Sequence, residues 1–466
     1  MTAPAVTAQT LADEVAVTYG TEAFLSKDYA EAEKELLWPR VWQQAGRTED
    51  IPQVGDYFTY DICDDSLIIL RVAAGDTKDC FRALYNVCAH RGRTLIDVPE
   101  GSNGVRGNTR RGFTCAFHGW SYDLEGKNTF ILHEFDWQGA LNADCTSLTQ
   151  CRLDLWQGFI YIDQREEQAE SLSEYLGRAG EILDHFEIGK MRWKWRQYCI
   201  YPANWKTAIE AFMEPYHTTS THHQLTAYAE FYAYSKAYGL HSVSGFDQVA
   251  SREKTEQGGG VSRAGKGEDP RVSTYELAYE NYSTINNAAS TDTLINAAAR
   301  LKDELPEGTP VGEVMAHWMK RAKADDAARG VIWPEVPPEV MKEAGLAWTL
   351  FPNTNILHGV TFALAYRARP YGNDPDQCLF EAYALERYPD GEEPATDWVK
   401  ADPLTEQAKW GLVLSQDFNN MQWVHKGMKN RGFKGALPNP HQEQKIINAH
   451  RNLAEFMGRG GPVVLG

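Results

Sequence analysis

Two short stretches of the sequence each place a cysteine beside a histidine. Cys88 and His90 form the first pair, Cys115 and His118 form the second, and residues 91–114 separate them. Two such pairs on facing loops supply two thiolates and two imidazoles. A tetrahedral zinc ion accepts this set, and so does a [2Fe–2S] centre with two cysteines on one iron and two histidines on the other. The spacing predicts a metal centre, and the residue types leave zinc and iron–sulfur both open.

A second group of metal-binding side chains lies in "EAFMEPYHTTSTHH", residues 210–223. If this stretch is helical, Glu210, Glu214 and His217 share one face, because residues three and four apart lie on the same side of a helix. His222 follows His217 by five positions, about 140° round an ideal helix. Helical geometry alone therefore does not make His222 a second ligand, although the poor helix formers between them permit a break.

The surrounding chain divides by pattern into parts that must position these groups. Short alternating apolar runs at 41–165 predict a β domain that contains both Cys/His pairs. Residues 1–40 are expected to be an acidic helical lead-in, and residues 166–466 alternate strands with amphipathic helices, which predicts an α+β arrangement. The polar, glycine-rich residues 253–271 have the composition of a lid or a disordered loop. They lie in the segment 252–330, whose role the sequence leaves open.

Composition limits the classes of function. The chain has 466 residues, 43% of them hydrophobic, and a formal net charge of −18. Such acidity argues against nucleic acid or an anionic membrane as a partner. We expect a cytoplasmic protein, because the N-terminus lacks the basic and apolar regions of a signal peptide and no apolar run approaches a membrane span. Eight cysteines in such a chain do not indicate a disulfide framework.

The residues flanking the Cys/His pairs carry a resemblance to a known domain. Cys-x-His-Arg-Gly, followed by Cys-x-x-His-Gly-Trp-x-Tyr-Asp-x-x-Gly, resembles the signature of Rieske iron–sulfur domains. The resemblance implies a [2Fe–2S] cluster with Cys88 and Cys115 on one iron and His90 and His118 on the other. It favours iron–sulfur over a structural zinc site.

The gap between the two pairs is longer than the family leads us to expect. The excess lies in "PEGSNGVRGNTRRG", residues 99–112, which we expect to be a surface insertion between strands. It carries Arg106, Arg110 and Arg111. These arginines are either a docking patch for an acidic electron donor or an ordinary solvated basic loop.

Glu214-Pro-Tyr-His217, followed by His222, resembles the mononuclear iron motif of Rieske non-heme iron ring-hydroxylating oxygenases, large (alpha) subunits. The resemblance selects His217 and His222 as ligands, with His223 as the less favoured alternative. It also gives Glu214 a catalytic role, as a bridge across a subunit boundary to a cluster histidine of the neighbouring chain. Glu210 is left as structural.

The same family places an aspartate on a late helix as third ligand, which completes the two-histidine, one-carboxylate set of Fe(II) oxygenases. "LSQDFNNMQWVHKG" offers Asp417, and on a helix Asp417, Met421 and Val424 share a face that would point inward. Asp402 and Asp397 are alternatives in polar, loop-like sequence. The resemblance therefore implies one Fe(II) held by His217, His222 and Asp417.

The resemblance further implies a fold and an activity. It predicts an N-terminal Rieske β domain and a C-terminal helix-grip (START-like) catalytic domain with an antiparallel sheet. The activity would be that of a terminal oxygenase component that takes electrons from a reductase or ferredoxin and uses O2 to hydroxylate, by cis-dihydroxylation, a small aromatic or apolar substrate. A monooxygenase or oxidative demethylase of a small or N-methylated substrate is the alternative. A homotrimer, or an α3β3 assembly with a small β subunit, is expected.

Residues around the iron motif are candidates for the substrate pocket. Ala208, Phe212 and Met213 flank the motif, and the aromatic stretch 228–243 and the strand-like stretch 351–359 would form further walls. Ordinary core packing explains each of them equally well. Two other functions stay open at this level, a pure electron-transfer protein and a zinc-stabilised binding module.

Overall fold

The computed structural model describes residues 15–165, 170–228, 231–247 and 269–465. The chain forms two compact units. The first, called the β unit here, contains Ala30–Tyr175 and Pro370–Asp374. The second, called the α+β unit, contains the residues up to Tyr29, Leu176–Arg369 and the residues from Pro375 onward.

A seven-stranded sheet in the order β2-β11-β10-β5-β4-β3-β6 is the framework of the β unit. Its strands are β2 (Gln43–Arg47), β3 (Asp56–Ile62), β4 (Asp65–Arg71), β5 (Phe81–Tyr85), β6 (Arg106–Asn108), β10 (Gln150–Trp156) and β11 (Phe159–Asp163). The apolar run of β4 is central and fully buried, as expected of a strand covered on both faces. The expected surface insertion at 99–112 is more than a loop, since it contributes β6, which pairs with β3 at the sheet edge.

A second, three-stranded sheet in the β unit carries one of the Cys/His pairs. It consists of β7 (Phe113–Thr114), β8 (Ser121–Tyr122) and β9 (Asn128–Phe130) in that order. The β7–β8 hairpin encloses Cys115 and His118, and the loop after β5 holds Cys88 and His90. Short helices α3 (Ala143–Thr146) and η4 (Glu134–Trp137) follow it.

The N-terminal segment is helical from residue 22 onward. Helices α1 (Glu22–Leu25) and α2 (Lys27–Leu36) lie there, and residues 1–14 of the expected lead-in fall outside the described residues. Before the helices, β1 (Val17–Thr18) pairs with β20 (Val463–Val464) near the C-terminus. Long-range strand pairing of this kind leaves no signal in a local pattern.

An eight-stranded sheet in the order β13-β14-β15-β16-β17-β18-β12-β19 is the framework of the α+β unit. Its strands are β12 (Arg192–Tyr201), β13 (Ala233–Tyr238), β14 (His241–Phe246), β15 (Ala347–Leu350), β16 (Thr354–His358), β17 (Phe362–Pro370), β18 (Cys378–Glu386) and β19 (Trp398–Lys400). Strand β12 is antiparallel to β18 and parallel to the short β19. A large antiparallel sheet with helices confirms the expected α+β class.

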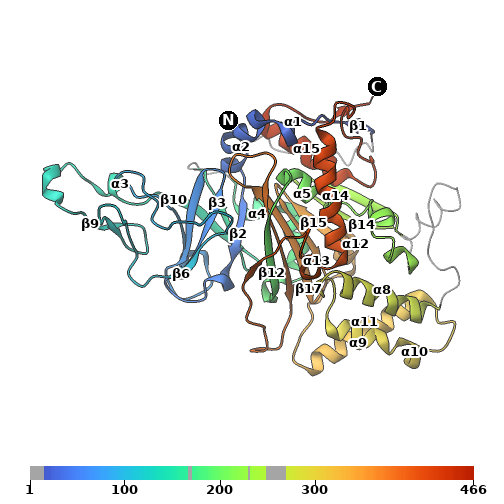
Figure 1. The fold of residues 1–466 in the computed structure, drawn as a ribbon. Helices are drawn as coiled ribbons and strands as arrows, with labels where there is room; N and C mark the ends of the chain where they lie inside the picture. The colour runs from blue at the N-terminus through green and yellow to red at the C-terminus, as the bar shows by residue number, and fades with distance from the viewer. Residues whose placement is uncertain (1–14, 166–169, 229–230, 248–268, 466) are drawn as a thin grey trace. The chain divides into compact units, whose positions relative to one another are not determined.

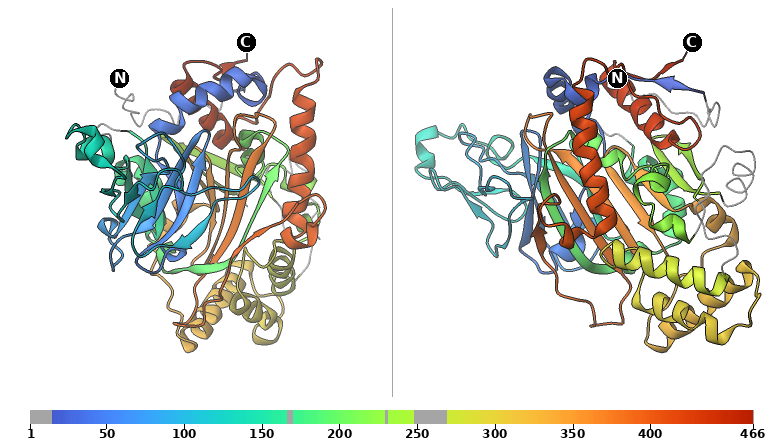
Figure 2. Two further views of the ribbon diagram at one scale, coloured as in Figure 1. Left: turned by 60° about the vertical axis from the view of Figure 1, so that its left-hand side comes forward. Right: turned by 45° about the vertical axis from the view of Figure 1, so that its right-hand side comes forward.

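Three helices matter for the site. Helix α5 (Trp205–Glu210) lies against β18 and α14 (Leu412–Met428), and α15 (Gln444–Met457) lies against β13 and β14. Figure 2 shows α14 running the length of the sheet. A short helix, α13 (Gln407–Trp410), precedes α14 and is separated from it by Gly411, which has a positive φ of +84°.

Helices between β14 and β15 form a module with its own apolar core. The module consists of α8 (Pro270–Thr284), α9 (Asp292–Ala299), α10 (Leu301–Glu304) and α11 (Val311–Ala328), and α12 (Pro338–Ala344) follows it before β15. Ile295, Leu301 and Val314 are buried at the centre of the module. The expected glycine-rich lid or disordered loop at 253–271 lies outside the described residues as far as 268, and its last three residues are the N-cap and first residues of α8. No helix among the described residues is long and apolar enough to cross a membrane.

Candidate metal centres

The two Cys/His loops of the β unit have the same backbone design. In each, a glycine four residues after the cysteine adopts positive φ, +73° at Gly92 and +74° at Gly119. The glycine N–H donates to the carbonyl of Cys88 or Cys115 at 3.0 Å, and each cysteine N–H donates to the carbonyl five residues ahead at 2.8 Å. A Cβ at either glycine would meet no atom within 4 Å, so glycine is needed there for its conformation and not for space.

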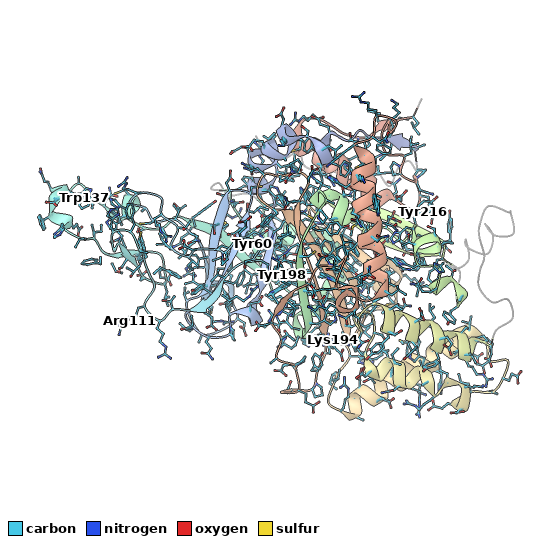
Figure 3. The ribbon with its side chains drawn as sticks, viewed as in Figure 1. Tyr60, Arg111, Trp137, Lys194, Tyr198 and Tyr216 are labelled. Atoms are coloured by element: carbon cyan, nitrogen blue, oxygen red, sulfur yellow. The ribbon has the colours of Figure 1, made fainter. Side chains whose placement is uncertain are left out.

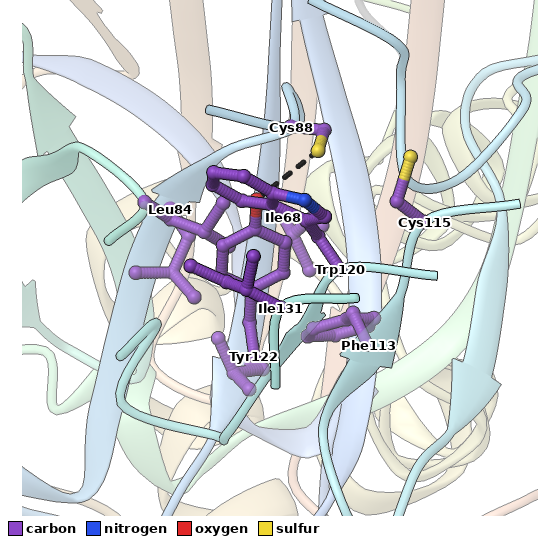
Figure 4. Packing of buried hydrophobic residues seen from close by; sticks show 10 residues of the cluster. Ile68, Leu84, Cys88, Phe113, Cys115, Trp120, Tyr122 and Ile131 are labelled. Atoms are coloured by element: carbon purple, nitrogen blue, oxygen red, sulfur yellow. Dashed lines mark hydrogen bonds between the residues drawn. The ribbon is translucent and has the colours of Figure 1, made fainter. Parts of the chain in front are cut away.

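These turns point the thiols inward and leave the imidazoles nearer the surface. Cys88 and Cys115 are each 2% exposed, at the edge of an apolar cluster (Figure 4). The His90 ring stacks on Trp120 with centroids 4.9 Å apart and lies edge-on to His118 at 4.6 Å. Two thiols and two imidazoles therefore converge from two loops.

The free valences of these side chains fit a bound cluster. Nδ1 of His118 is buried and has no hydrogen-bond partner among the residues that the structure describes. Such an orphaned buried ring nitrogen is costly unless a ligand satisfies it. Burial, and then the neighbouring His118 and Arg91, lower the pKa of His90, which favours the neutral imidazole that binds metal.

Tyr122 is a polar neighbour of the cysteines. Its Oη lies 3.1 Å from Sγ of Cys88 (Figure 4). The same oxygen accepts the N–H of Ala89 at 3.1 Å. Because that N–H occupies an acceptor position, the hydroxyl proton is free to point at the sulfur. Burial, and then the hydrogen bond to Cys88, raise the pKa of Tyr122. A donor to a ligating sulfur stabilises the reduced form of an iron–sulfur centre.

Exposed apolar side chains surround the Cys/His loops. Phe117, between the second cysteine and histidine, is 57% exposed, and Phe130, Leu132 and Phe135 on and after β9 are 53%, 48% and 76% exposed. Arg91 lies over the Phe117 ring at 5.6 Å. We call Phe117, Phe130, Leu132 and Phe135 the tip patch. Clustered exposed apolar residues of this kind mark an interaction surface. Arg111 is exposed as well (Figure 3).

In the α+β unit, three ligand atoms converge in one place. Nε2 of His217 and Nε2 of His222 are 3.2 Å apart, and Oδ1 of Asp417 lies 3.3 Å from the first and 3.0 Å from the second. Among the described residues these three form a group that could hold a metal ion. His223 is exposed, and Asp402 instead accepts a backbone N–H in its own exposed turn. Two imidazoles and one carboxylate are the donor set of non-heme Fe(II) sites.

The segment that carries both histidines is not one continuous helix. Helix α5 ends at Glu210, and α6 (Thr218–Thr221) begins only after His217. Pro215 explains the interruption, because it has no N–H to donate and disfavours helical backbone at the residue before it. Glu214 and His217 do project together, but through a turn. The Glu214 carboxylate accepts the backbone N–H of His217 at 3.1 Å and its Nδ1–H at 2.7 Å.

Gln416, which no sequence motif indicated, holds His222, the other histidine of the triad. Oε1 of Gln416 lies 2.8 Å from Nδ1 of His222, and it also accepts from the side chain of Gln224 at 3.0 Å. An amide oxygen carries no proton and can only accept, so Nδ1 of His222 is the donor. Both histidines are thereby fixed with Nδ1 protonated and Nε2 turned to the shared point, as metal-binding imidazoles require.

The electrostatics of the triad favour a positive charge at its centre. Burial lowers the pKa of His217, but hydrogen bonds to Asp417 and then Glu214 outweigh it, so the pKa is raised well above its usual value. Burial raises the pKa of Asp417, and the charge of His222 and hydrogen bonds from both histidines overcome it, so that pKa is lowered. The buried Asp417 carboxylate stabilises a proton on the neighbouring imidazoles. A divalent cation at the same point would take the place of that proton and supply the positive charge instead.

Helix α14 positions Asp417 with a face different from the expected one. Asp417, Phe418 and Met421 are buried, but Val424 is 49% exposed. The inward stripe continues instead to His425, which is bonded to Asp376. The expectation for Val424 was wrong because the four-residue step from 421 to 425 follows the core more closely than the three-residue step.

Of the expected pocket residues, Phe212 packs among aromatic side chains of β17 and β18. Phe212 stacks on Tyr366 with centroids 4.2 Å apart and lies 5.2 Å from Phe380. Ala208 and Met213 are buried. The aromatic group lies beside the triad, since Phe418, the residue after Asp417, packs edge-on against Phe380 with ring centroids 5.0 Å apart. Burial, and then the charge of Asp417, raise the pKa of Tyr366.

A thiolate–imidazole loop pair in a small β unit, joined in one chain to a two-histidine, one-carboxylate triad on an α+β sheet, defines the class of Rieske-type non-heme iron oxygenases. Residues 41–131 match the family model of the Rieske [2Fe-2S] domain, and residues 186–459 match that of the ring hydroxylating alpha subunit (catalytic domain). The chain belongs to this family of Rieske ring-hydroxylating oxygenase alpha subunits.

Curated relatives include more than one activity. The chain is 29% identical to the benzene 1,2-dioxygenase subunit alpha of Pseudomonas putida over 221 residues, 46% of either chain. It is 26% identical to the carnitine monooxygenase oxygenase subunit of Acinetobacter baumannii over 215 residues, 45% of this chain and 53% of that one. The chain thus spans about half the length of the curated relatives it matches.

Solved structures share the fold over nearly the whole chain. A naphthalene 1,2-dioxygenase with indole bound matches with a TM-score of 0.63 at 19% identity, covering 95% of this chain and 92% of that one. A quaternary ammonium Rieske monooxygenase in complex with L-carnitine matches with a TM-score of 0.61 at 17% identity, covering 95% and 96%. At this identity the matches establish the fold and leave the substrate open.

Proposed function

We propose that this chain is a terminal oxygenase component, which receives electrons from a separate reductase or ferredoxin and uses O2 to hydroxylate an organic substrate. The observation that carries the proposal is that both donor sets are complete in one chain, Cys88, His90, Cys115 and His118 in the β unit and His217, His222 and Asp417 in the α+β unit. An electron carrier alone would not need the triad.

The residues would divide the work as follows. When bound, a [2Fe–2S] cluster accepts single electrons, and Fe(II) with open positions activates O2. Glu214 and Gln416 hold the two histidines so that only Nε2 faces the metal. Asp417, 4% exposed, supplies the anionic ligand from a buried position. The aromatic rings of Phe212, Tyr366 and Phe380 give the triad an apolar flank.

Aromatic cis-dihydroxylation is the proposed outcome, because an apolar flank of stacked rings favours an aromatic or apolar substrate. The relatives named for benzene dioxygenation support it. The half-length match to a carnitine monooxygenase supports the alternative, monooxygenation or demethylation of an N-methylated substrate. Turnover with 18O-labelled O2 separates the two: a diol carries both labelled atoms, whereas an alcohol or a released aldehyde carries at most one.

Assembly of several copies is part of the proposal. Beside the triad, Tyr216 is 48% exposed (Figure 3), and Trp423 and Val424 on α14 are 57% and 49% exposed. The tip patch is the matching apolar surface on the β unit. Joining one copy's tip patch to a neighbour's Trp423 face is a heterologous contact, which closes as a ring. We propose a homotrimer or an α3β3 assembly in which Glu214 of one copy faces His90 or His118 of the next.

His217→Ala tests the central claim. It removes one of three ligand atoms at the shared point, so we expect turnover to be lost and one iron per chain to be missing. The visible and electron paramagnetic resonance (EPR) spectra of the Rieske cluster should stay unchanged, because its donors lie in the other unit. Turnover that survives in His217→Ala, or zinc in place of iron in the wild-type protein, would refute the assignment.

A further inference from the structure

Lys445 is buried in the α+β unit without a carboxylate to neutralise it. The side chain is 0% exposed. Its Nζ donates to Oδ1 of Asn355 at 3.0 Å, the carbonyl of Ala347 at 3.1 Å and Oγ of Ser244 at 3.2 Å, and no ion pair to it occurs among the residues that the structure describes. Lysine is almost never fully buried without a charged partner.

The position of Lys445 in its helix adds to the free-energy cost of burying its charge. It is the second residue of α15, where the helix dipole already places partial positive charge. Burial is the largest influence on its pKa, which is lowered well below the usual value, and the only opposing influence is the charge of Glu214. Side chains that violate burial and dipole rules together are expected where a function requires them.

The contact with Asn355 connects Lys445 to the triad. Oδ1 of Asn355 accepts from Lys445 and also from Oγ1 of Thr349 at 2.9 Å. This fixes the amide so that Nδ2 points the other way, where it donates to the carbonyl of Phe212 at 2.6 Å. Phe212 lies in the turn between α5 and Glu214, so its carbonyl is an anchor for the segment that supplies the first histidine of the triad.

The same segment is held a second time from the neighbouring strand. Asn355 on β16 and Tyr366 on β17 are directly opposite each other in the sheet register. Asn355 binds the backbone of Phe212, and Tyr366 stacks on its ring at 4.2 Å. One cross-strand pair therefore contacts Phe212 through both its backbone and its side chain, and these two contacts restrain the turn that leads to His217.

We propose that Lys445 and Asn355 are positioning residues of the metal triad, with Lys445 orienting Asn355 and Asn355 anchoring the Phe212 turn that aims Glu214 and His217. This inference rests on the proposed function of the triad and names residues that do not touch the metal. Without the donor at Phe212, the turn that Pro215 has already freed from helical hydrogen bonds would lose its main tie to the sheet.

Metal binding measured without turnover tests this inference. Co(II) titration of iron-free triad in the otherwise complete protein reports ligand geometry by its visible absorption, and competition with Fe(II) reports affinity. We expect Lys445→Met to weaken metal binding by about tenfold or more and to change the Co(II) spectrum. His217→Ala is measured alongside Lys445→Met. If both variants keep wild-type Co(II) binding, the assignment of the triad is wrong. If only Lys445→Met keeps it, the triad stands and the positioning role is wrong.

Asn355→Asp separates positioning from stability. The aspartate keeps an oxygen for Lys445 and adds a counter-charge, which offsets the cost of placing its second oxygen against the Phe212 carbonyl. It has no N–H for the Phe212 carbonyl, so metal affinity should still fall and the Co(II) spectrum should still change. A merely structural lysine predicts the opposite, an unchanged spectrum.

Asn448→Ala is the matched control. Asn448 is also on α15, is 8% exposed, and donates to the carbonyl of Gly239 at 3.0 Å, away from Phe212. This variant should lower the melting temperature without altering Co(II) binding. The inference is overturned if Asn355→Asp retains wild-type affinity and spectrum, or if Asn448→Ala perturbs the metal site as much as Lys445→Met does.

Discussion

The two donor sets of this chain are built by different means. In the β unit, each cysteine is fixed by bonds to residues four and five positions away, and the apolar side chains of the tip patch are exposed. In the α+β unit, His222 is bonded to a glutamine 194 positions away, and Asp417 is 4% exposed. A local design tolerates solvent, since its shape depends on turns alone. A long-range design requires that two helices and a sheet be docked correctly.

The two sets also differ in their electrostatics. Near the Cys/His loops, burial and positive neighbours lower the pKa of His90. At the triad, carboxylates raise the pKa of His217 despite its burial. A neutral imidazole is therefore available in the β unit without competition from protons, whereas a metal ion at the triad must displace one. The triad is the site whose occupation depends more on pH and on its supporting residues.

Cys88→Ala is expected to have the largest effect on one donor set while leaving the other intact. The variant should lose the whole iron–sulfur absorbance, because one of two thiolates is gone, and retain iron at the triad, because that set lies in the other unit. Iron analysis with EPR measures both. Cys145→Ala, at an exposed cysteine, is the control. Simultaneous loss of triad iron in Cys88→Ala would show that the sets are not independent.

Glu214→Gln is expected to have the next largest effect. The amide oxygen can still accept from Nδ1 of His217, but the negative charge is lost, and such changes to a ligand's partner typically cost about 10–100-fold in activity or affinity. Steady-state O2 consumption with a chemical reductant measures it. Glu210→Gln, whose carboxylate bonds His450 at 2.7 Å, should have a much smaller effect. Equal losses in the two variants would contradict the role given to Glu214.

Tyr122→Phe should change the reduction potential of the cluster in the β unit and leave the triad unaffected. Loss of the hydroxyl near Sγ of Cys88 removes one hydrogen bond of about 1 kcal/mol, so the midpoint potential should fall by a few tens of millivolts. Spectroelectrochemistry measures the shift. Tyr57→Phe, which packs on the same apolar cluster, serves as control. An unchanged potential in Tyr122→Phe would mean that the hydroxyl proton does not point at the sulfur.

Glu443→Gln is expected to have the smallest effect, a change in how the stability of the α+β unit depends on pH. Burial, together with the charges of Glu214 and Glu210, raises the pKa of Glu443 to about 7 in spite of a hydrogen bond from Asn439. The folded protein therefore retains a proton that the unfolded chain releases above about pH 4.5, so stability from this group declines as pH rises from there to about 7. The variant should gain roughly 1–3 kcal/mol over the wild-type protein at pH 8 and little at pH 4.5. Denaturant unfolding at the two pH values measures it, and an equal difference at both would refute the assignment.

Much of the architecture could be predicted because it is locally encoded. Apolar runs such as those of β4, β12 and β18 define their own strands, and α11 follows its 3.6-residue pattern. The strand β6 was hidden in an apparent insertion, because a three-residue edge strand has too few residues for a pattern. A shared helical face for Glu210, Glu214 and His217 was considered on the condition that the stretch is helical, and the structure shows that the helix ends at Glu210, before Pro215.

The sequence by itself determined the Cys/His loops, because their shape depends on glycines and bonds within five residues, and it determined the pairing of Glu214 with His217 across three residues. Only the tertiary structure decided that Asp417, and not Asp402 or Asp397, lies with the two histidines. It also decided that Gln416 holds His222 and that Lys445 reaches Phe212 through Asn355. These contacts depend on sheet register and on how α14 and α15 dock, and such long-range packing has no signature in the spacing of residues along the chain.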